Sequence, residues 1–137
     1  MNQQLATYCI YTIRQRDFLD ENAEKTDLEI PEGRPWITGR QLWQEAQEAN
    51  LAMPVLFADA ADTSGLLYWG LLKQVSVAGE TTKYTVDQLR RFKLHHLAQE
   101  LVLRSTDQNI APNFIRPYAI CYTPKFMEEE TQADVIS

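Results

Sequence analysis

The chain has 137 residues and a mass of 15.8 kDa, which is the usual size of one domain. Hydrophobic residues make up 45% of the sequence and charged residues 23%, so a disordered chain, a collagen-like repeat and a disulfide-rich miniprotein are excluded. The formal net charge of −6 argues, taken alone, against a nucleic-acid partner.

The negative charge is concentrated in two segments. Residues 17–32 hold seven acidic side chains against one lysine, and residues 128–137 hold four acidic side chains and no base. The intervening residues 33–127 carry a net charge of +2. We therefore expect a slightly basic folded body, whose acidic segments either keep the protein soluble or screen a basic groove from other polyanions.

Strands and one helix are predicted in the first half of the chain. Residues 7–14 are β-branched and aromatic, which is typical of a strand. The polar, acidic residues 15–35 predict a long mobile loop with at most one short helical turn. Residues 38–41, Thr-Gly-Arg-Gln, match a capping box and predict a helix over about 39–50. Its apolar stripe consists of Leu42, Trp43, Ala46 and Ala49.

The next three apolar runs predict an antiparallel meander. They span residues 55–60, 66–77 and about 82–86, and short turns separate them. The middle run is apolar on both faces, so we expect a curled sheet that covers it on both sides. Gly70 fits a bulge or a tight bend in that curl.

The last third of the chain predicts one more helix and one more strand. Leu89, Phe92, His96 and Leu97 follow helical spacing, and we place a helix over about 94–103, although residues 88–92 fit an extension of the preceding strand equally well. Residues 116–122 predict a final strand. The tail from Glu128 onward is expected to be frayed.

The cellular location is predicted from what the sequence lacks. The longest apolar stretch, residues 65–72, is far shorter than the roughly 20 residues of a membrane helix. The first residues show no secretory signal, so we expect a cytoplasmic protein with no membrane contact. Two buried reduced thiols are favoured for Cys9 and Cys121, since a disulfide requires that their two strands face each other.

Metal-binding and catalytic motifs are not recognised. His95 and His96 are adjacent and point to different faces, and the two cysteines lack C-x-x-C spacing, so no metal site is predicted. No Gly-x-Ser-x-Gly elbow precedes a serine, and the glycines do not cluster into a phosphate-binding loop. No catalytic residue and no cofactor is predicted.

Aromatic and arginine side chains make up the most suggestive group. Aromatic rings stack on nucleobases, arginine supplies paired donors, and short hydroxyls read polar base edges. The candidate ligand-binding residues are Trp36, Tyr68, Trp69, Arg104, Ser105, Thr106, Arg116 and Tyr118. The alternative is that the tryptophans fill the core and the arginines cap helices or pair with acids. A short basic run, usually a solvated face, consists of Arg90, Arg91, Lys93, His95 and His96.

The order of these elements resembles the PUA-like superfamily, which includes PUA, ASCH and EVE domains. The resemblance covers about residues 5–126 and rests on the segments VLFADAADTSGLLYWGLL and VLRSTDQNIAPNFIRPYAIC. It implies an α+β fold, a small curled antiparallel β-pseudobarrel with one or two flanking helices. We expect a single domain over 1–127 and an acidic flexible tail over 128–137.

The same resemblance implies that RNA or a modified base is recognised in a cleft between helix and barrel, without a cofactor. The G-x-K-x-x-E signature of ASCH domains is missing before the predicted helix, where the chain reads Gly33-Arg34-Pro35-Trp36. ASCH-type amidohydrolase chemistry is therefore not implied.

The leading hypothesis is a non-catalytic module that binds RNA, single-stranded DNA or a modified nucleoside. In it, Trp36 and Trp69 stack on a base, while Arg104 and Arg116 hold a phosphate or a base edge. Hydrogen bonds come from Ser105, Thr106 and Tyr118.

Two alternatives belong to other functional classes. One is a small amidohydrolase acting on a modified nucleoside, with Glu100 or Asp59 as general base beside Thr106 or Lys73. The other is an oligomeric interaction module, such as a homodimer, whose exposed aromatic residues form an interface. The sequence leaves open whether the protein is an enzyme.

Overall fold

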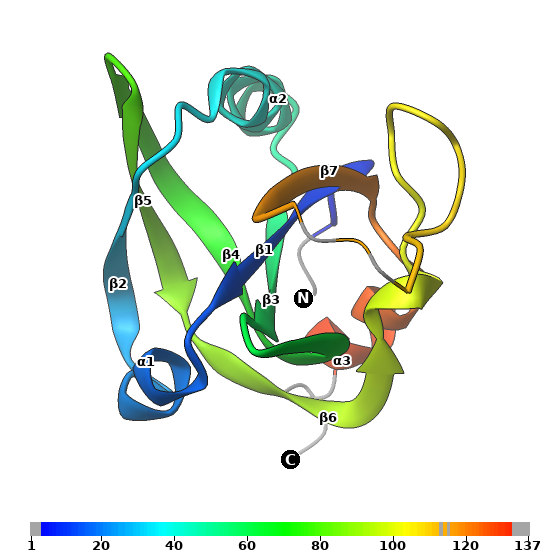
Figure 1. The fold of residues 1–137 in the computed structure, drawn as a ribbon. Helices are drawn as coiled ribbons and strands as arrows, with labels where there is room; N and C mark the ends of the chain where they lie inside the picture. The colour runs from blue at the N-terminus through cyan, green and yellow to red at the C-terminus, as the bar shows by residue number, and fades with distance from the viewer. Residues whose placement is uncertain (1–3, 113, 115, 133–137) are drawn as a thin grey trace.

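The computed structural model describes residues 4–112, 114 and 116–132. The elements, in chain order, are β1 (Tyr8–Arg14), α1 (Arg16–Glu21), β2 (Thr26–Glu32), α2 (Ile37–Glu48), β3 (Pro54–Asp59), β4 (Asp62–Ala78), β5 (Thr81–Gln88), β6 (Arg90–Leu97), the 3-10 turn η1 (Ala98–Glu100), β7 (Tyr118–Tyr122) and α3 (Phe126–Gln132) (Figure 1). The fold is therefore α+β, as expected, and its centre is a strongly bent sheet.

The described strands form one mixed seven-stranded sheet. Its order is β2-β5-β4-β3-β1-β7, and β6 pairs with β4 off this path. The expectation of a wholly antiparallel sheet is wrong, because β1 and β3 are parallel. Parallel strands need a crossover connection, and the chain between β1 and β3 supplies one that includes α2. In the described chain the sheet is not closed, since the path ends at β2 and β7.

The central strands β1, β3 and β4 bury side chains on both faces. Ile10, Phe57 and Tyr68 belong to one buried cluster on the side of α2, and their chain neighbours Tyr11, Leu56 and Trp69 belong to a second cluster with Met127 of α3. Alternate residues of a strand point to opposite faces, so a sheet covered on both sides reads as a continuous apolar run. The two-sided covering of the middle strand is thus confirmed.

At Gly70, where a bulge or a tight bend was predicted, β4 changes its partner strand. Strand β4 pairs with β5 from Leu72 onward and with β6 up to Trp69. A Cβ atom at Gly70 would lie 2.8 Å from Cβ of Val86 and 2.9 Å from the carbonyl oxygen of Gln88. The close approach of the strands leaves no room for a side chain.

The acidic loop predicted over 15–35 is wrong. Helix α1 and strand β2 occupy most of it, and β2 pairs with β5 in the register Ile30 with Tyr84. The prediction failed because the exposed acidic side chains of Asp27 and Glu29 alternate with Leu28 and Ile30, whose side chains turn inward. This is the period-two pattern of a strand with one solvated face.

Helix α2 confirms the predicted helix, but the capping box is wrong. The N-cap is Trp36, which makes no side-chain capping bond. The indole ring of Trp36 lies in the core, and its backbone N–H donates to Oγ1 of Thr82 at 2.8 Å. Core packing therefore sets the start of the helix. Asn50, predicted to end the helix, has the left-handed φ of 59° that suits a residue just past a helix end.

The C-terminal third differs most from expectation. The helix predicted over 94–103 is instead strand β6 followed by η1. The final strand is confirmed as β7, which pairs antiparallel with β1. The frayed tail is wrong for residues 128–132, which belong to α3, and residues 133–137 lie outside the described chain.

Candidate functional site

The structure covers the aromatic rings that the sequence analysis singled out. Trp36 is fully buried and its ring stacks on two tyrosines. The centroid of its ring lies 4.2 Å from that of Tyr84 and 4.9 Å from that of Tyr118. The hydroxyl of Tyr118 accepts the N–H of Gly39 at 3.0 Å, which ties β7 to α2. This aromatic stack is a core feature that joins three elements.

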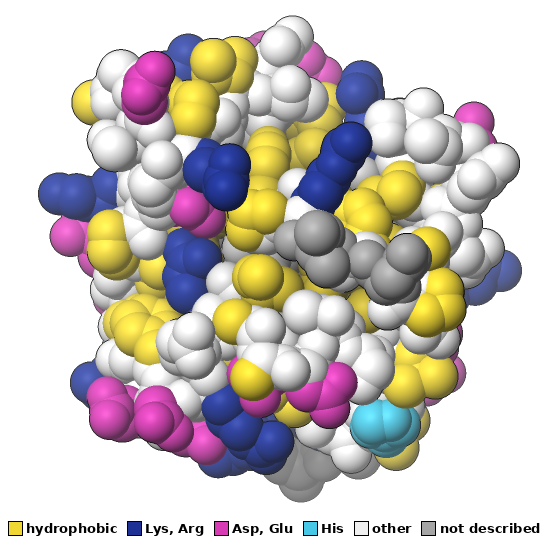
Figure 2. Space-filling model, viewed as in Figure 1, with side chains coloured by type: hydrophobic (Ala, Val, Ile, Leu, Met, Phe, Trp, Pro, Cys, Tyr) yellow, Lys and Arg dark blue, Asp and Glu magenta, His cyan; other side chains and the backbone are white. Residues whose placement is uncertain are grey.

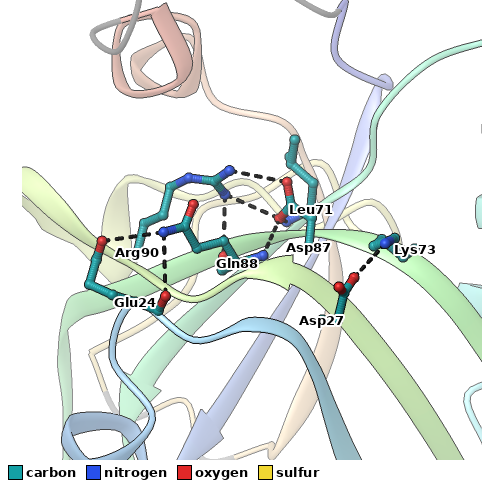
Figure 3. Close-up of polar contacts among 7 residues, drawn as sticks. All are labelled: Glu24, Asp27, Leu71, Lys73, Asp87, Gln88 and Arg90. Atoms are coloured by element: carbon teal, nitrogen blue, oxygen red, sulfur yellow. Dashed lines mark hydrogen bonds and ion pairs between the residues drawn. The ribbon is translucent and has the colours of Figure 1, made fainter.

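Trp69 is covered by an arginine. The guanidinium carbon of Arg90 lies 4.6 Å from the indole centroid, and the side chain of Trp69 faces the second cluster. Asp87 fixes the arginine through two contacts of 3.1 Å and also accepts the N–H of Leu71 at 2.9 Å (Figure 3). Asp87 and Arg90 thus form the corner between β5 and β6 and close off the indole ring.

The remaining predicted residues lie in separate places. Arg104, Ser105 and Thr106 are exposed in one loop, where Arg104 lies 5.1 Å from the ring of Tyr8. Arg116 is exposed just before β7. The structure therefore brings Trp36 together with Tyr118, and the three loop residues together, but it does not gather the predicted set around one cleft.

One predicted residue, Tyr68, lies at a basic cleft. A cavity of about 280 Å³ opens beside β4 and β6. Its lining residues are Arg16, Leu66, Leu67, Tyr68, Arg91, Phe92, Lys93, Leu94 and His95. We call this cavity the β6 cleft. Four basic side chains line it: Arg16 from α1, and Arg91, Lys93 and His95 from β6. Of the other basic residues of β6, Arg90 covers Trp69 and His96 is buried.

A large bulge in β6 creates the cleft. Leu66 pairs with His96 and Tyr68 pairs with Arg91, so two steps along β4 correspond to five steps along β6. The extra residues 92–95 leave the β4 ladder, and their side chains project around the opening. Bulges re-aim side chains, and here the bulge directs four consecutive side chains to the rim of the cleft.

Helix α3 satisfies the backbone groups that the bulge leaves unpaired. The carboxylate of Glu130 is 2% exposed and accepts the N–H groups of Lys93 at 3.0 Å and Leu94 at 3.3 Å. It also lies 3.4 Å from Nε2 of His96, whose ring stacks on Phe126. This carboxylate therefore holds the wall of the β6 cleft in place.

An acidic side chain lies between the two arginines of the cleft. Asp20 of α1 lies 3.7 Å from Nε of Arg16 and 3.6 Å from Nη2 of Arg91, and it accepts the hydroxyl of Tyr68 at 2.7 Å. Burial, and next the hydrogen bond to Asp20, raise the pKa of Tyr68 to about 12, so this hydroxyl remains a donor at neutral pH. Two guanidinium groups and one hydroxyl thus converge on a single anionic group.

The charge around the cleft is mixed. In Figure 2, Lys and Arg side chains gather along the lower edge of the molecule, between acidic side chains over α1 and a histidine over β6. The side chains of Arg16 and Arg91 are 58% and 60% exposed, so both are accessible from solvent. The cleft is a small basic site with an acidic flank.

The cleft was not predicted from the sequence, because its basic lining residues lie in segments that were interpreted as a loop or as a solvated face. Arg16 and Asp20 fell in the predicted loop, and Arg91, Lys93 and His95 were interpreted as a solvated face. The usable signal was the basic run itself, which has no acidic neighbour over residues 88–99. Only the fold shows that α1 lies beside it.

The residues suggested for amidohydrolase chemistry are engaged elsewhere. Lys73 pairs with Asp27, Glu100 accepts the N–H of Leu97 at 2.6 Å, and Thr106 accepts the N–H of Gln108 at 3.2 Å. The described residues contain no group of three or more His, Cys, Asp or Glu side chains suited to a metal ion. No helix among them is long and apolar enough to cross a membrane.

Comparison with known proteins finds no match to this chain among family models, curated proteins or solved structures.

Proposed function

We propose that the protein is a non-catalytic binding module for a nucleotide, free or at a single-stranded nucleic acid, and that the β6 cleft holds a phosphate. The observation that carries this proposal is the arrangement around Asp20. Arg16, Arg91 and the hydroxyl of Tyr68 surround its carboxylate as they would surround a phosphate oxygen. Guanidinium groups favour planar, paired contacts to such oxygens.

The size and flank of the cleft favour a short ligand. Its volume of about 280 Å³ is close to the lower end of small-molecule sites, which begin near 300 Å³. The exposed acids Asp17 and Glu21 on α1 would repel a long polyanion that continued past the cleft. A mononucleotide or the end of a single strand satisfies both limits.

The PUA-like pseudobarrel remains part of this proposal. A strongly bent sheet with a core on each face and helices outside it supports that architecture. The proposal differs from the sequence-based hypothesis in one respect: Trp36 and Trp69 are covered, so a phosphate contact replaces base stacking as the main source of affinity.

The test is a pair of substitutions with opposite expected signs. Asp20→Asn removes the anion that competes for both arginines, so affinity for a labelled short RNA, a single-stranded DNA and adenosine monophosphate should rise. Arg91→Gln removes one phosphate contact, and the dissociation constant should increase roughly tenfold at low salt. Fluorescence anisotropy measures the affinity for each labelled strand, and competition against a labelled strand measures the affinity for the mononucleotide.

The salt dependence and a matched control complete the test. Arg91→Gln loses one phosphate contact, so the logarithm of the association constant for single-stranded nucleic acid should fall less steeply with the logarithm of the salt concentration. The slope should be smaller in magnitude by roughly 0.7. Lys83→Gln removes one exposed charge from β5 that lines a different opening, beside Pro31 and Ser76, and should leave affinity unchanged. Equal losses for Arg91→Gln and Lys83→Gln, or no effect of Asp20→Asn, would show that binding does not use the β6 cleft.

A further inference from the structure

Cys9 and Cys121 face each other across two paired strands. They are direct register partners in the antiparallel pair of β1 and β7. Register partners in such a pair project to the same face, and both cysteines belong to the second buried cluster. The first and last strands of the sheet thus place their only thiols side by side, although 111 residues separate them in the sequence.

The spacing of the pair fits a disulfide. Thr123 donates its N–H to the carbonyl of Thr7 at 2.8 Å, two positions along the ladder from the cysteines. Because hydrogen-bonded pairs recur every two residues, Cys9 and Cys121 form a hydrogen-bonded pair, with Cα atoms about 5.5 Å apart. Disulfides usually have Cα separations of roughly 4.4–6.8 Å, which this pair meets. They also need Cβ separations of roughly 3.5–4.5 Å, so the Cβ atoms, about 4.5–5.5 Å apart in opposite residues, must move slightly closer when the bond forms.

Both thiols are shielded in the folded chain. Each cysteine is fully buried, and burial raises the pKa of the Cys121 thiol to about 12. Burial, and next the nearby Cys121, raise the pKa of Cys9 well above its usual value. A protonated, buried thiol does not attack an oxidant, so any reaction requires that β7 separates from β1 or that the chain is still folding.

We propose that Cys9 and Cys121 form an intramolecular disulfide when the chain folds in the presence of a small-molecule disulfide such as glutathione disulfide. One thiol loses its proton and attacks a sulfur of the reagent, which forms a mixed disulfide and releases one reagent thiol. The other cysteine then attacks the protein sulfur and releases the second reagent thiol. Two electrons pass from the cysteines to the reagent, and the two protons end on the released thiols.

The bond would join the first and last strands of the sheet. It closes a loop of more than 100 residues, the type of crosslink that most restricts the unfolded chain. Once the chain has folded around it, the bond lies where soluble reductants do not reach. The disulfide would therefore stabilise the pairing of β1 with β7. It would form only when the chain folds under oxidising conditions, and it would then persist in the folded protein.

The test is refolding of the full chain from denaturant with reduced or oxidised glutathione, followed by mass spectrometry without reductant. After oxidative refolding, the thiol titre in denaturant should fall from two per chain to none, with the mass lower by two hydrogen atoms. Trypsin should release residues 1–14 linked to residues 105–125, since no lysine or arginine precedes Arg14 and Pro117 prevents cleavage after Arg116. The melting temperature should rise by roughly 10 °C.

Two results would overturn the proposal. One is glutathione attached to each cysteine without the linked peptides, and the other is a disulfide-bonded dimer in place of the intramolecular bond. Cys121→Ala should give one glutathione adduct or a dimer and no oxidant-dependent stabilisation of the monomer. Because the measurement on the unchanged chain needs no variant, the proposal stays testable even if this substitution prevents folding.

Discussion

Buried tyrosine hydroxyls make stability sensitive to high pH. Burial is the main cause that raises the pKa of Tyr11, Tyr68 and Tyr118 to about 12, against 10 for an exposed tyrosine. Because the folded pKa is the higher one, the stabilisation is complete below pH 10 and is lost as the pH rises to about 12. Urea unfolding at increasing pH should show this loss, together with late appearance of tyrosinate absorbance. Tyrosinate appearing near pH 10 with unchanged stability would contradict it.

Gly70 and Gly33 form a matched pair for testing close packing. Gly70→Ala places a Cβ against Val86 and the backbone of Gln88, and overpacking should lower the free energy of unfolding by about 1–3 kcal/mol. Gly33→Ala meets nothing within 4 Å, so it should change stability by less than about 1 kcal/mol. Denaturant unfolding of both variants gives the comparison, and equal effects would argue against a tight crossing of β4 and β5.

At the scale of elements, Glu130 connects α3 to the bulge of β6. Glu130→Ala removes a buried carboxylate that accepts the backbone N–H groups of Lys93 and Leu94 and lies beside His96, and should lower the free energy of unfolding by about 3 kcal/mol. Hydrogen exchange at the amides of Lys93 and Leu94 should become faster. Glu129→Ala, on the exposed side of the same helix, should cost no more than about 0.5 kcal/mol. Unchanged exchange in the first variant would contradict this role.

The same bulge explains why β6 resembled a helix in the sequence. Buried residues in a regular strand recur every two positions, but the extra residues 92–95 displace the inward positions. Leu89 and His96 are buried and Phe92 is half-buried, which gives spacings of three and four, typical of a helix. A local irregularity that depends on a distant partner, Glu130, cannot be recognised from local periodicity.

Regular elements were predictable where one pattern dominated. The runs that became β1, β3, β4, β5 and β7 were recognised from their apolar, β-branched and aromatic residues, and α2 was recognised from the helical spacing of its apolar stripe. Strand β2 was missed because acidic side chains on its solvated face outweighed two inward residues, Leu28 and Ile30. The candidate site was less predictable, since Tyr68 alone of the predicted residues lines the β6 cleft.

On the scale of the whole molecule, charge is separated by segment. The chain carries a net charge of −6, yet Arg16 and Arg91 remain exposed beside the acidic helix α1. Such an arrangement attracts a small anion at short range and repels a long polyanion at low salt. A mononucleotide should therefore compete effectively with a short single strand, and duplex DNA should bind weakly.

The most direct test of the central claim is to map ligand binding by two-dimensional NMR while adenosine monophosphate is added. We expect concentration-dependent shifts at the amides of Arg16, Tyr68 and residues 91–95, which line the β6 cleft. Asp20→Asn should move these shifts to lower nucleotide concentrations, and Arg91→Gln should move them to roughly tenfold higher concentrations. Shifts confined to the loop of Arg104, Ser105 and Thr106, or no shifts anywhere, would contradict the account.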